Sequence, residues 1–361
     1  MRHDRWKRQR ALAFELKLRL AECEFLTGAL ADAEKRLAKL APRAVDAVEG
    51  AAVAGLQIDV YTTLDLGDDA IAIDLEHLKR HLGIDWSLRA TDEVQNEYRL
   101  IWLQLGKRSV EGLVDSPLMT DSAQRATLDV LMRLVGAAWH THANLACMAI
   151  CRAVRLSLDA GNCDSSCYHY SSLGYIAGPR FGDCPAGYRF GRLGCELLEK
   201  RGLNRFRARV YKDFGAHVVP WTKHVRTSRD ILLKALDVAN QTGDLTFAAD
   251  SYVSLNSNAL AAGDPLSDVQ NQAEIALAFA RKLRFQFAID LAGAQLGLVR
   301  TLRKLTRKLG SFDDSEFDEM EAERRFEANP NLILAATSYW VRKLQACVFA
   351  GDSVAAVHAS R

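Results

Sequence analysis

The stretch Arg180–Glu199, RFGDCPAGYRFGRLGCELLE, contains a turn that recurs along the chain. Its Gly182-Asp183 pair indicates the end of one helix and the start of the next. Glycine reaches the left-handed conformation that ends a helix at little cost. Asp183 can cap the following helix with its carboxylate, and Pro185 fits that helix's first turn. Gly187 is small enough to let the second helix lie close against the first, so the stretch predicts two antiparallel helices joined by a tight corner.

The same corner recurs, usually with a small residue at the fifth place after the glycine. The further copies are Gly28 with Ala33, Gly67-Asp68 with Ala72, Gly243-Asp244 with Ala248, and Gly351-Asp352 with Ala356. Gly263-Asp264 shares the turn, but Asp268 occupies the small position. No stretch shows sustained two-residue alternation, so we expect no sheet. The pattern predicts an all-α fold, an α-solenoid of antiparallel helical hairpins.

The hairpins divide at one soft boundary. Asp115-Ser116-Pro117 is typical of a loop, and a fresh helix cap follows at Asp121. We expect N-terminal helical hairpins over residues 1–115 and a helical-repeat solenoid, continuous with them, over residues 116–361. Nothing after the hairpin at Gly351 resembles a polar capping helix, and a solenoid needs a cap at each open end. This suggests that the chain is part of something longer or that a partner covers its ends.

Length and composition indicate a folded protein and exclude several function classes. The chain has 361 residues, of which 49% are hydrophobic and 25% charged, and its formal net charge is +2. That balance gives no reason to expect nucleic acid or a membrane as partner, and no apolar run is long enough for a transmembrane helix. Glu15, Lys17 and Arg19 interrupt the early apolar stretch, which does not fit a signal peptide. Eight cysteines without an export signal indicate reduced thiols and a cytoplasmic location.

A segment rich in cysteine and histidine is the first candidate site. Its members are His140, His142, Cys147, Cys151, Cys163, Cys167 and His169. Thiolate and imidazole groups are ligands for zinc and related metals. The spacing differs from the C-x2-C of the common zinc knuckle, and cysteines on helix faces are often small core residues. A metal or thiol redox sensor built on Cys147–His169 is therefore the alternative function, whereas the main interpretation expects no metal and no cofactor.

The second candidate site is an interruption of the helical pattern after residue 216. It carries aromatic and basic side chains, namely His217, Pro220, Trp221, His224 and Arg226. Such side chains in an exposed connection suit binding of a partner or an acidic ligand. The alternative is a buried tryptophan and exposed histidines in a long inter-helix turn. We take His217, Trp221, His224 and Arg226 as the candidate partner- or ligand-binding residues.

No catalytic motif is present. The glycines of residues 174–194 approach a G-x-x-x-G ladder, but no Lys-Ser or Lys-Thr follows them, as a phosphate-binding loop requires. Kinase signatures, a G-x-S-x-G elbow and an H-E-x-x-H zinc motif are also missing. The basic Arg300–Lys308 and acidic Asp313–Glu323 runs indicate solvated faces or pairing across a turn. We therefore expect no enzyme activity in this chain.

A series of short segments, in the same order and over nearly the whole chain, carries a family resemblance. They are Ala21–Gly28, Gly83–Trp86, Pro117–Asp121, Arg180–Asp183, Glu199–Leu203, Pro220–Thr222, Thr242–Leu245, Ala262–Leu266, Gly310–Phe312 and Trp340–Ala346. In these the chain resembles the helical-repeat region of large bacterial hybrid signalling proteins. Those proteins join a serine/threonine-kinase-like domain, a signal-transduction ATPase, a region like this one, a GAF domain and a sensor histidine kinase.

The resemblance implies a tetratricopeptide-like solenoid that links an ATPase switch to kinase output. Its partners would be the ATPase and kinase modules of the same or a neighbouring chain, with a small effector as a further candidate. It implies no catalysis here, because the family's nucleotide and phosphotransfer motifs lie in domains that this chain lacks, and no functional residue is carried over. Cys163, His169 and His217 depart from the family's pattern, which argues against a family-wide metal role.

Overall fold

The computed structural model describes residues 9–64, 66–86, 92–139, 141–329 and 332–360. These residues are mostly helical and contain no strand, with one isolated bridge between Leu118 and Asn162. The expected all-α fold without a sheet is confirmed for this part of the chain. None of its helices has the length and apolar character needed to cross a membrane. Packing divides the chain into two compact units, the first ending at Phe206 and the second beginning at Arg207.

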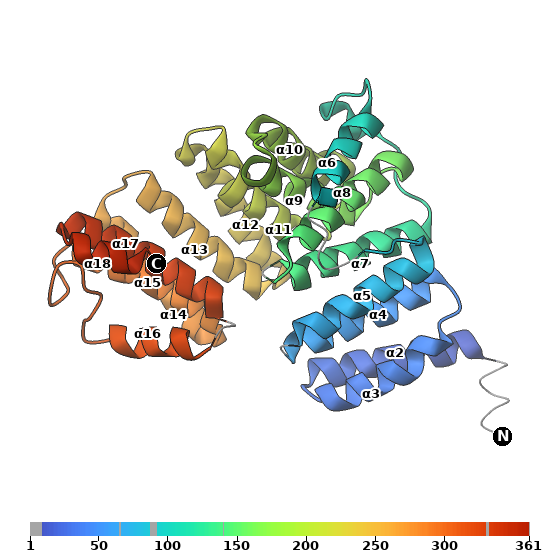
Figure 1. Cartoon of the computed structure of the whole chain (residues 1–361), viewed down its shortest axis with the longest axis horizontal. Helices are drawn as coiled ribbons and strands as arrows, with labels where there is room; N and C mark the ends of the chain where they lie inside the picture. The colour runs from blue at the N-terminus through green and yellow to red at the C-terminus, as the bar shows by residue number, and fades with distance from the viewer. Residues whose placement is uncertain (1–8, 65, 87–91, 140, 330–331, 361) are drawn as a thin grey trace. The chain divides into compact units, whose positions relative to one another are not determined.

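Unit 1 consists of helices that pack on their neighbours in the sequence (Figure 1). Its elements are α2 (Arg10–Leu26), α3 (Leu30–Leu40), η1 (Ala41–Arg43), α4 (Ala47–Thr63), α5 (Gly67–Leu82), α6 (Asp92–Leu105), η2 (Glu111–Asp115), α7 (Ser122–Ala138), α8 (Ala143–Ala160), α9 (Asp164–Phe181) and α10 (Cys184–Arg201). Consecutive helices form the pairs α2–α3, α4–α5, α7–α8 and α9–α10. Contacts of α4 with α7, α6 with α8 and α8 with α9 connect these pairs.

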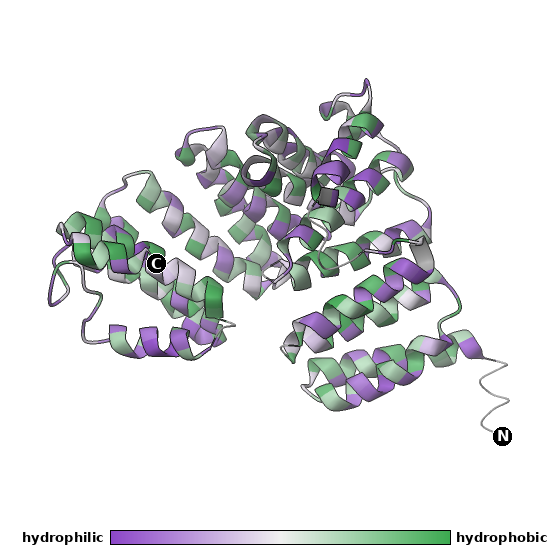
Figure 2. Ribbon diagram, in the orientation of Figure 1, coloured by the Kyte–Doolittle hydropathy of each residue, from purple (hydrophilic) through white to green (hydrophobic). Residues whose placement is uncertain are grey.

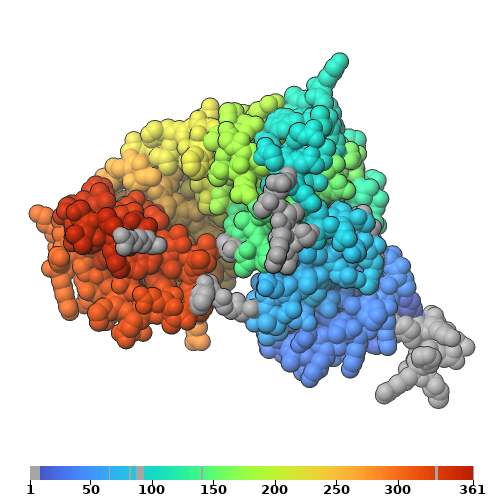
Figure 3. All heavy atoms as spheres, in the orientation of Figure 1, coloured from blue at the N-terminus to red at the C-terminus, as the bar shows by residue number. Residues whose placement is uncertain are grey.

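Unit 2 follows the same principle after a less regular start. Its elements are α11 (Arg207–Asp213), η3 (Phe214–Val218), η4 (Val219–Trp221), η5 (Val225–Ser228), α12 (Arg229–Thr242), α13 (Leu245–Ala261), α14 (Leu266–Leu283), α15 (Gln286–Leu302), α16 (Glu319–Ala328), α17 (Ile333–Ala350) and α18 (Ser353–Ala359). The pairs are α12–α13, α14–α15 and α17–α18, connected by contacts of α13 with α14 and of α15 with α17. In the space-filling view of Figure 3, colour changes gradually within each unit because helices adjacent in sequence pack together.

The soft boundary expected at residue 115 lies inside unit 1, at the end of η2. This segment is held to a later helix of the same unit. The guanidinium of Arg201 on α10 donates hydrogen bonds to the carbonyl oxygens of Val114 at 2.8 Å and Ser116 at 3.2 Å. Because these bonds tie the loop to α10, the loop belongs to unit 1, and the chain divides later, between Phe206 and Arg207.

Three of the expected corners have the expected geometry. They are Gly182-Asp183, Gly243-Asp244 and Gly351-Asp352. Each glycine is left-handed, with φ values of 71°, 71° and 70° respectively. Each aspartate caps the next helix by accepting a hydrogen bond from the backbone N–H three residues further on, at 3.0, 3.3 and 3.0 Å. The local sequence therefore sets both the end of one helix and the start of the next.

At Gly67 the prediction of a helix-ending glycine was wrong. Helix α4 already ends at Thr63, and Gly67 is the first residue of α5. The residue that follows α4, Leu64, has φ −80° and ψ 0°, so this helix ends without a left-handed residue. The small residue expected to pack at the fifth place, Ala72, is exposed.

Helices α9 and α10 pack closely through their glycines. A Cβ atom on Gly187 would lie 2.7 Å from the carbonyl oxygen of Gly174, and one on Gly174 would lie 3.1 Å from Cα of Gly191. Gly178 lies opposite Cys184, so the two helices run antiparallel. The predicted close approach at Gly187 is confirmed, and the glycine ladder is accounted for by helix packing.

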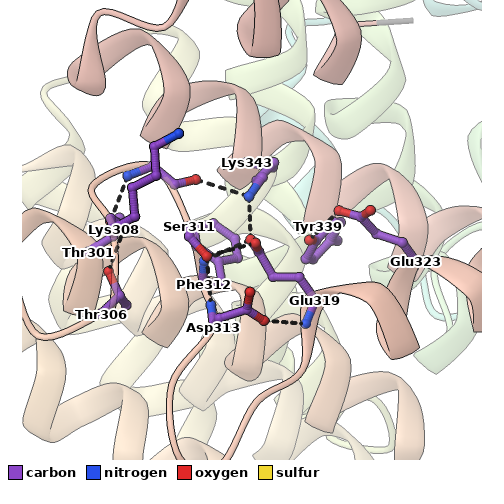
Figure 4. A network of polar contacts seen from close by, with 11 residues as sticks. Thr301, Thr306, Lys308, Ser311, Phe312, Asp313, Glu319, Glu323, Tyr339 and Lys343 are labelled. Atoms are coloured by element: carbon purple, nitrogen blue, oxygen red, sulfur yellow. Dashed lines mark hydrogen bonds and ion pairs between the residues drawn. The ribbon is translucent and has the colours of Figure 1, made fainter.

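The charged runs of residues 300–323 are partly paired, as one of the two sequence interpretations expected. Arg300 lies 2.6 Å from Asp314 across the turn after α15. Figure 4 shows that Glu319, at the start of α16, pairs with Lys343 of α17 and accepts the backbone N–H of Phe312 at 2.7 Å. These contacts hold the long connection against the helices and place the ring of Phe312 in the core of the unit.

Candidate functional site

The second candidate site of the sequence, residues 217–226, lies in unit 2 between α11 and α12. Helix α11 passes directly into the π-helical turn η3 and then into the short 3-10 turns η4 and η5. Pro220 accounts for the interruption, because it has no N–H to donate to the carbonyl of Ala216 and its ring would collide with that carbonyl in an α-helix. The region is a series of short helical turns, and π-turns often occur at functional sites.

Three of the four candidate residues lie at the surface. Trp221 is 62% exposed, and His224 and Arg226 are also exposed. The Arg226 guanidinium donates to the carbonyl oxygen of Ala262 at 2.7 Å and lies 3.4 Å from the carboxylate of Asp264. The same carboxylate lies 2.5 Å from Arg229, so it is shared between two guanidinium groups. The indole of Trp221 is the large apolar group that this site exposes to a partner.

His217 lies in a different environment. It is half-buried beside a cluster in which Lys212 Nζ lies 2.7 Å from Asp213 Oδ1 and 3.9 Å from Asp250 Oδ2. Burial, together with the charge of Lys212, lowers the pKa of His217 to about 4. The imidazole is therefore neutral at neutral pH. His217 does not join the three exposed residues as a positively charged binding surface.

The cluster beside His217 is a structural ion pair that the sequence analysis missed. Burial disfavours the charge of Lys212, but the neighbouring carboxylates of Asp213 and Asp250 outweigh it and raise the lysine pKa. Burial likewise opposes ionisation of Asp213, but Lys212 and Arg209 outweigh it and lower its pKa. Removing one partner of such a pair leaves an uncompensated buried charge. The cluster therefore stabilises the chain where the helix changes from α11 to the π-turn.

The cysteine- and histidine-rich segment of unit 1 is part of the core. Its buried members are Cys147, Cys151, Cys163, Cys167 and His169. The Nε2 atom of His169 lies 3.0 Å from the carbonyl oxygen of Leu128, so that nitrogen is already engaged. His140, which also belonged to the proposed ligand set, lies outside the described residues. Within the residues that the structure describes, no three His, Cys, Asp or Glu side chains are arranged to hold a metal ion.

The thiols of this segment are also poorly suited to redox sensing. Burial raises the pKa of Cys147, and raises those of Cys151 and Cys167 well above the ordinary value of 9.0. Metal ligation and thiol exchange both require the thiolate, which is favoured in exposed and electropositive surroundings. The geometry and the protonation state both argue against the metal or redox alternative.

A buried acid in unit 1 is a further feature that sequence reasoning missed. Asp74 on α5 is fully buried, and neither of its carboxyl oxygens has a hydrogen-bond partner among the described residues. Burial raises its pKa well above the ordinary value; Arg133 opposes this rise and Asp59 adds to it. The helical spacing could have predicted this burial, because Asp74 lies on the same helix face as Ile71 and Leu78, which are both fully buried. Since no solvent reaches Asp74, it can contact no substrate in this conformation.

The α17–α18 pair of unit 2 carries a group of exposed apolar side chains. Phe349 is 67% exposed and Val354 is 81% exposed, and Val348 and Val357 are also exposed. These residues surround the corner at Gly351, and Figure 2 colours both helices mainly as hydrophobic. We call Val348, Phe349, Val354 and Val357 the α17–α18 apolar face. Grouped exposed apolar side chains of this kind mark surfaces that contact other proteins.

Comparison with known proteins assigns this chain neither a family nor a function. No protein-family model matches the sequence, and no curated protein shows significant similarity to it.

Proposed function

We propose that the chain is a non-catalytic helical-repeat module for protein interaction and regulation. We further propose that its fold is a tetratricopeptide-like α-solenoid of antiparallel hairpins. The left-handed corners at Gly182, Gly243 and Gly351 support that architecture, as does the pairing of consecutive helices in each unit. Such stacked pairs leave extended surfaces for a partner.

The observation that carries the proposal is the α17–α18 apolar face. Burial of a large apolar side chain contributes about 1.5–3 kcal/mol, so four such side chains can supply a substantial share of a binding free energy. Trp221 offers a second contact, because exposed tryptophan is among the residues that most often dominate an interface.

The family resemblance supports a specific context for this module. We propose that it is the part of a bacterial ATPase–sensor-kinase signalling protein that links the ATPase switch to kinase output. The partners are then protein domains, the ATPase and kinase modules of the same or a neighbouring chain, in the cytoplasm. The proposal includes neither nucleic acid nor a membrane.

The first step of the test is to determine the coding sequence on both sides of this chain. We expect an ATPase segment on one side and GAF and histidine-kinase segments on the other. If neither neighbour encodes such a segment, the signalling context is refuted.

The second step measures binding directly. Each neighbouring domain is titrated into the chain by isothermal calorimetry, and we expect Phe349→Ser to weaken one of the two complexes at least tenfold, equivalent to about 1.4 kcal/mol. Met320→Ser is the matched control, because Met320 is 69% exposed but lies on α16. Trp221→Ala is measured alongside as a test of the second surface. Unchanged affinity for both Phe349→Ser and Trp221→Ala, with both variants folded, would reject these two surfaces.

A further inference from the structure

Asp74 of α5 lies where three helices of unit 1 meet. Helix α5 packs on α4 and α7, and α4 also packs on α7. The side chain of Asp74 is fully buried, and both of its carboxyl oxygens lack a hydrogen-bond partner among the described residues. A buried carboxylate without a partner is very costly, whereas the protonated acid carries no charge. The packing of these three helices therefore suits the protonated form of Asp74.

Charged groups from both neighbouring helices act on Asp74. Arg133 of α7 favours its ionisation, and Asp59 of α4 opposes it. On α5 itself, the buried His77 lies three residues further along the helix. Arg133 thus lies within electrostatic range of two carboxyl groups, one on each helix of the α4–α5 pair, and in this structure it pairs with Asp59.

The pair between Arg133 and Asp59 is loose. Arg133 Nε lies 3.5 Å from Asp59 Oδ1, whereas a strong charge-assisted hydrogen bond is about 2.7–2.9 Å long. Gly55, one helical turn before Asp59, makes room for the guanidinium, since a Cβ atom there would lie 2.8 Å from Arg133 Cζ. The side chain of Arg133 is also 27% exposed. Its guanidinium can therefore change partner by rotation of the side chain.

We propose that Asp74 is a proton-dependent switch at the α4–α5–α7 junction. In the state described here, Asp74 holds its proton and Arg133 connects α7 to Asp59 of α4. When Asp74 releases its proton to solvent during a local opening, the guanidinium of Arg133 leaves Asp59 and pairs with the new carboxylate on α5. The packing of α4 on α7 then loosens, and this packing is one of the contacts that join the first two hairpins to the rest of unit 1. The switch lies in unit 1 and the proposed interaction surfaces lie in unit 2, so either proposal can fail without the other.

Hydrogen–deuterium exchange at a series of pH values tests the switch. Exchange is followed in peptides from α4 and α7 between about pH 5 and about pH 9, and it is corrected for the intrinsic effect of pH on amide exchange. In the wild type we expect the corrected rate to rise about tenfold or more through one midpoint. Asp74→Asn should keep the low rate throughout. Asp159→Asn is the matched control, because Asp159 is exposed on α8, and it should follow the wild type.

Variants of the two neighbouring charges give the expected shift a direction. Asp59→Asn removes a negative charge and releases Arg133, so the midpoint should move to lower pH by about one unit or more. Arg133→Gln removes the cation, so the midpoint should move to higher pH, and Arg133→Lys should recover part of that shift. A purely structural role of these residues would change the exchange rate by the same factor at every pH.

Three results would overturn the switch. The first is the same pH profile in the wild type and in Asp74→Asn. The second is the absence of any transition in the wild type up to about pH 9. The third is a midpoint that moves in the same direction in Asp59→Asn and in Arg133→Gln. Circular dichroism at about pH 5 confirms that each variant retains the fold before its exchange is compared.

Discussion

Replacement of Gly187 by alanine would test the close packing of α9 on α10. The added methyl group would lie 2.7 Å from the carbonyl oxygen of Gly174 and 3.3 Å from Cβ of Ala177. Ordinary carbon–oxygen contacts are about 3.3 Å or longer. The carbonyl belongs to the backbone of α9, so the two helices must separate by roughly half an ångström to accept the methyl group.

The expected magnitude is a balance of two effects. Forcing an extra carbon into a well-packed contact costs about 1–3 kcal/mol. Alanine is favoured over glycine inside a helix by roughly 0.5–1 kcal/mol, which offsets part of that cost. We therefore expect Gly187→Ala to lower the free energy of unfolding by about 0.5–2 kcal/mol.

Urea unfolding followed by circular dichroism measures this change, with Gly136→Ala as the matched control. Gly136 lies within α7, is exposed, and a Cβ atom there would meet nothing within 4 Å. The free energy of unfolding of Gly136→Ala should rise by about 0.5–1 kcal/mol, because alanine has a higher helix propensity than glycine and meets no clash there. If Gly187→Ala is as stable as Gly136→Ala or more stable, the helices are not in close contact at this point and the reasoning from the glycine corner is refuted.

Three further predictions concern protonation and thiol exposure. The free energy of unfolding should fall by up to about 3 kcal/mol as the pH falls from 6.5 to about 4, because in this range His217 binds a proton more readily in the unfolded chain than in the folded one. In unfolding measurements, His217→Gln should abolish this part of the pH dependence. Because burial raises the pKa of Asp74, ionisation of this residue should destabilise the fold increasingly as the pH rises above about 4. The free energy of unfolding of Asp74→Asn should therefore rise relative to that of the wild type from that pH upward. A difference between the two proteins that does not change with pH would contradict the burial argument. A maleimide should label the exposed Cys23 well before Cys151 in native protein, as followed by mass spectrometry; rapid labelling of Cys151 would favour the thiol-sensor alternative.

Features set by local chemistry could be predicted from the sequence. The corner at Gly182 depends on the conformational freedom of one glycine and on a bond from Asp183 to a backbone N–H three residues away. The failure at Gly67 has an equally local cause, because Leu64 ends α4 without a left-handed residue. A helix can end in more than one way, and glycine marks only one of them.

Features set by distant residues could not be predicted in the same way. The neutral state of His217 depends partly on the buried Lys212, whose own charge is maintained by Asp250 from another helix. The surface exposure of Trp221 agrees with the expectation of an accessible turn, since Pro220 interrupts the helix there.

The glycine contacts between α9 and α10 also bear on how unit 1 assembles. They join residues close together in the chain, such as Gly178 with Cys184, whereas the bond from Arg201 to Val114 closes a span of 87 residues. Short spans lose little chain entropy on closure and form fast, and long spans wait for them. This pair is therefore expected to form early, and during synthesis it can provide a nucleus on which the preceding helices, already released by the ribosome, condense.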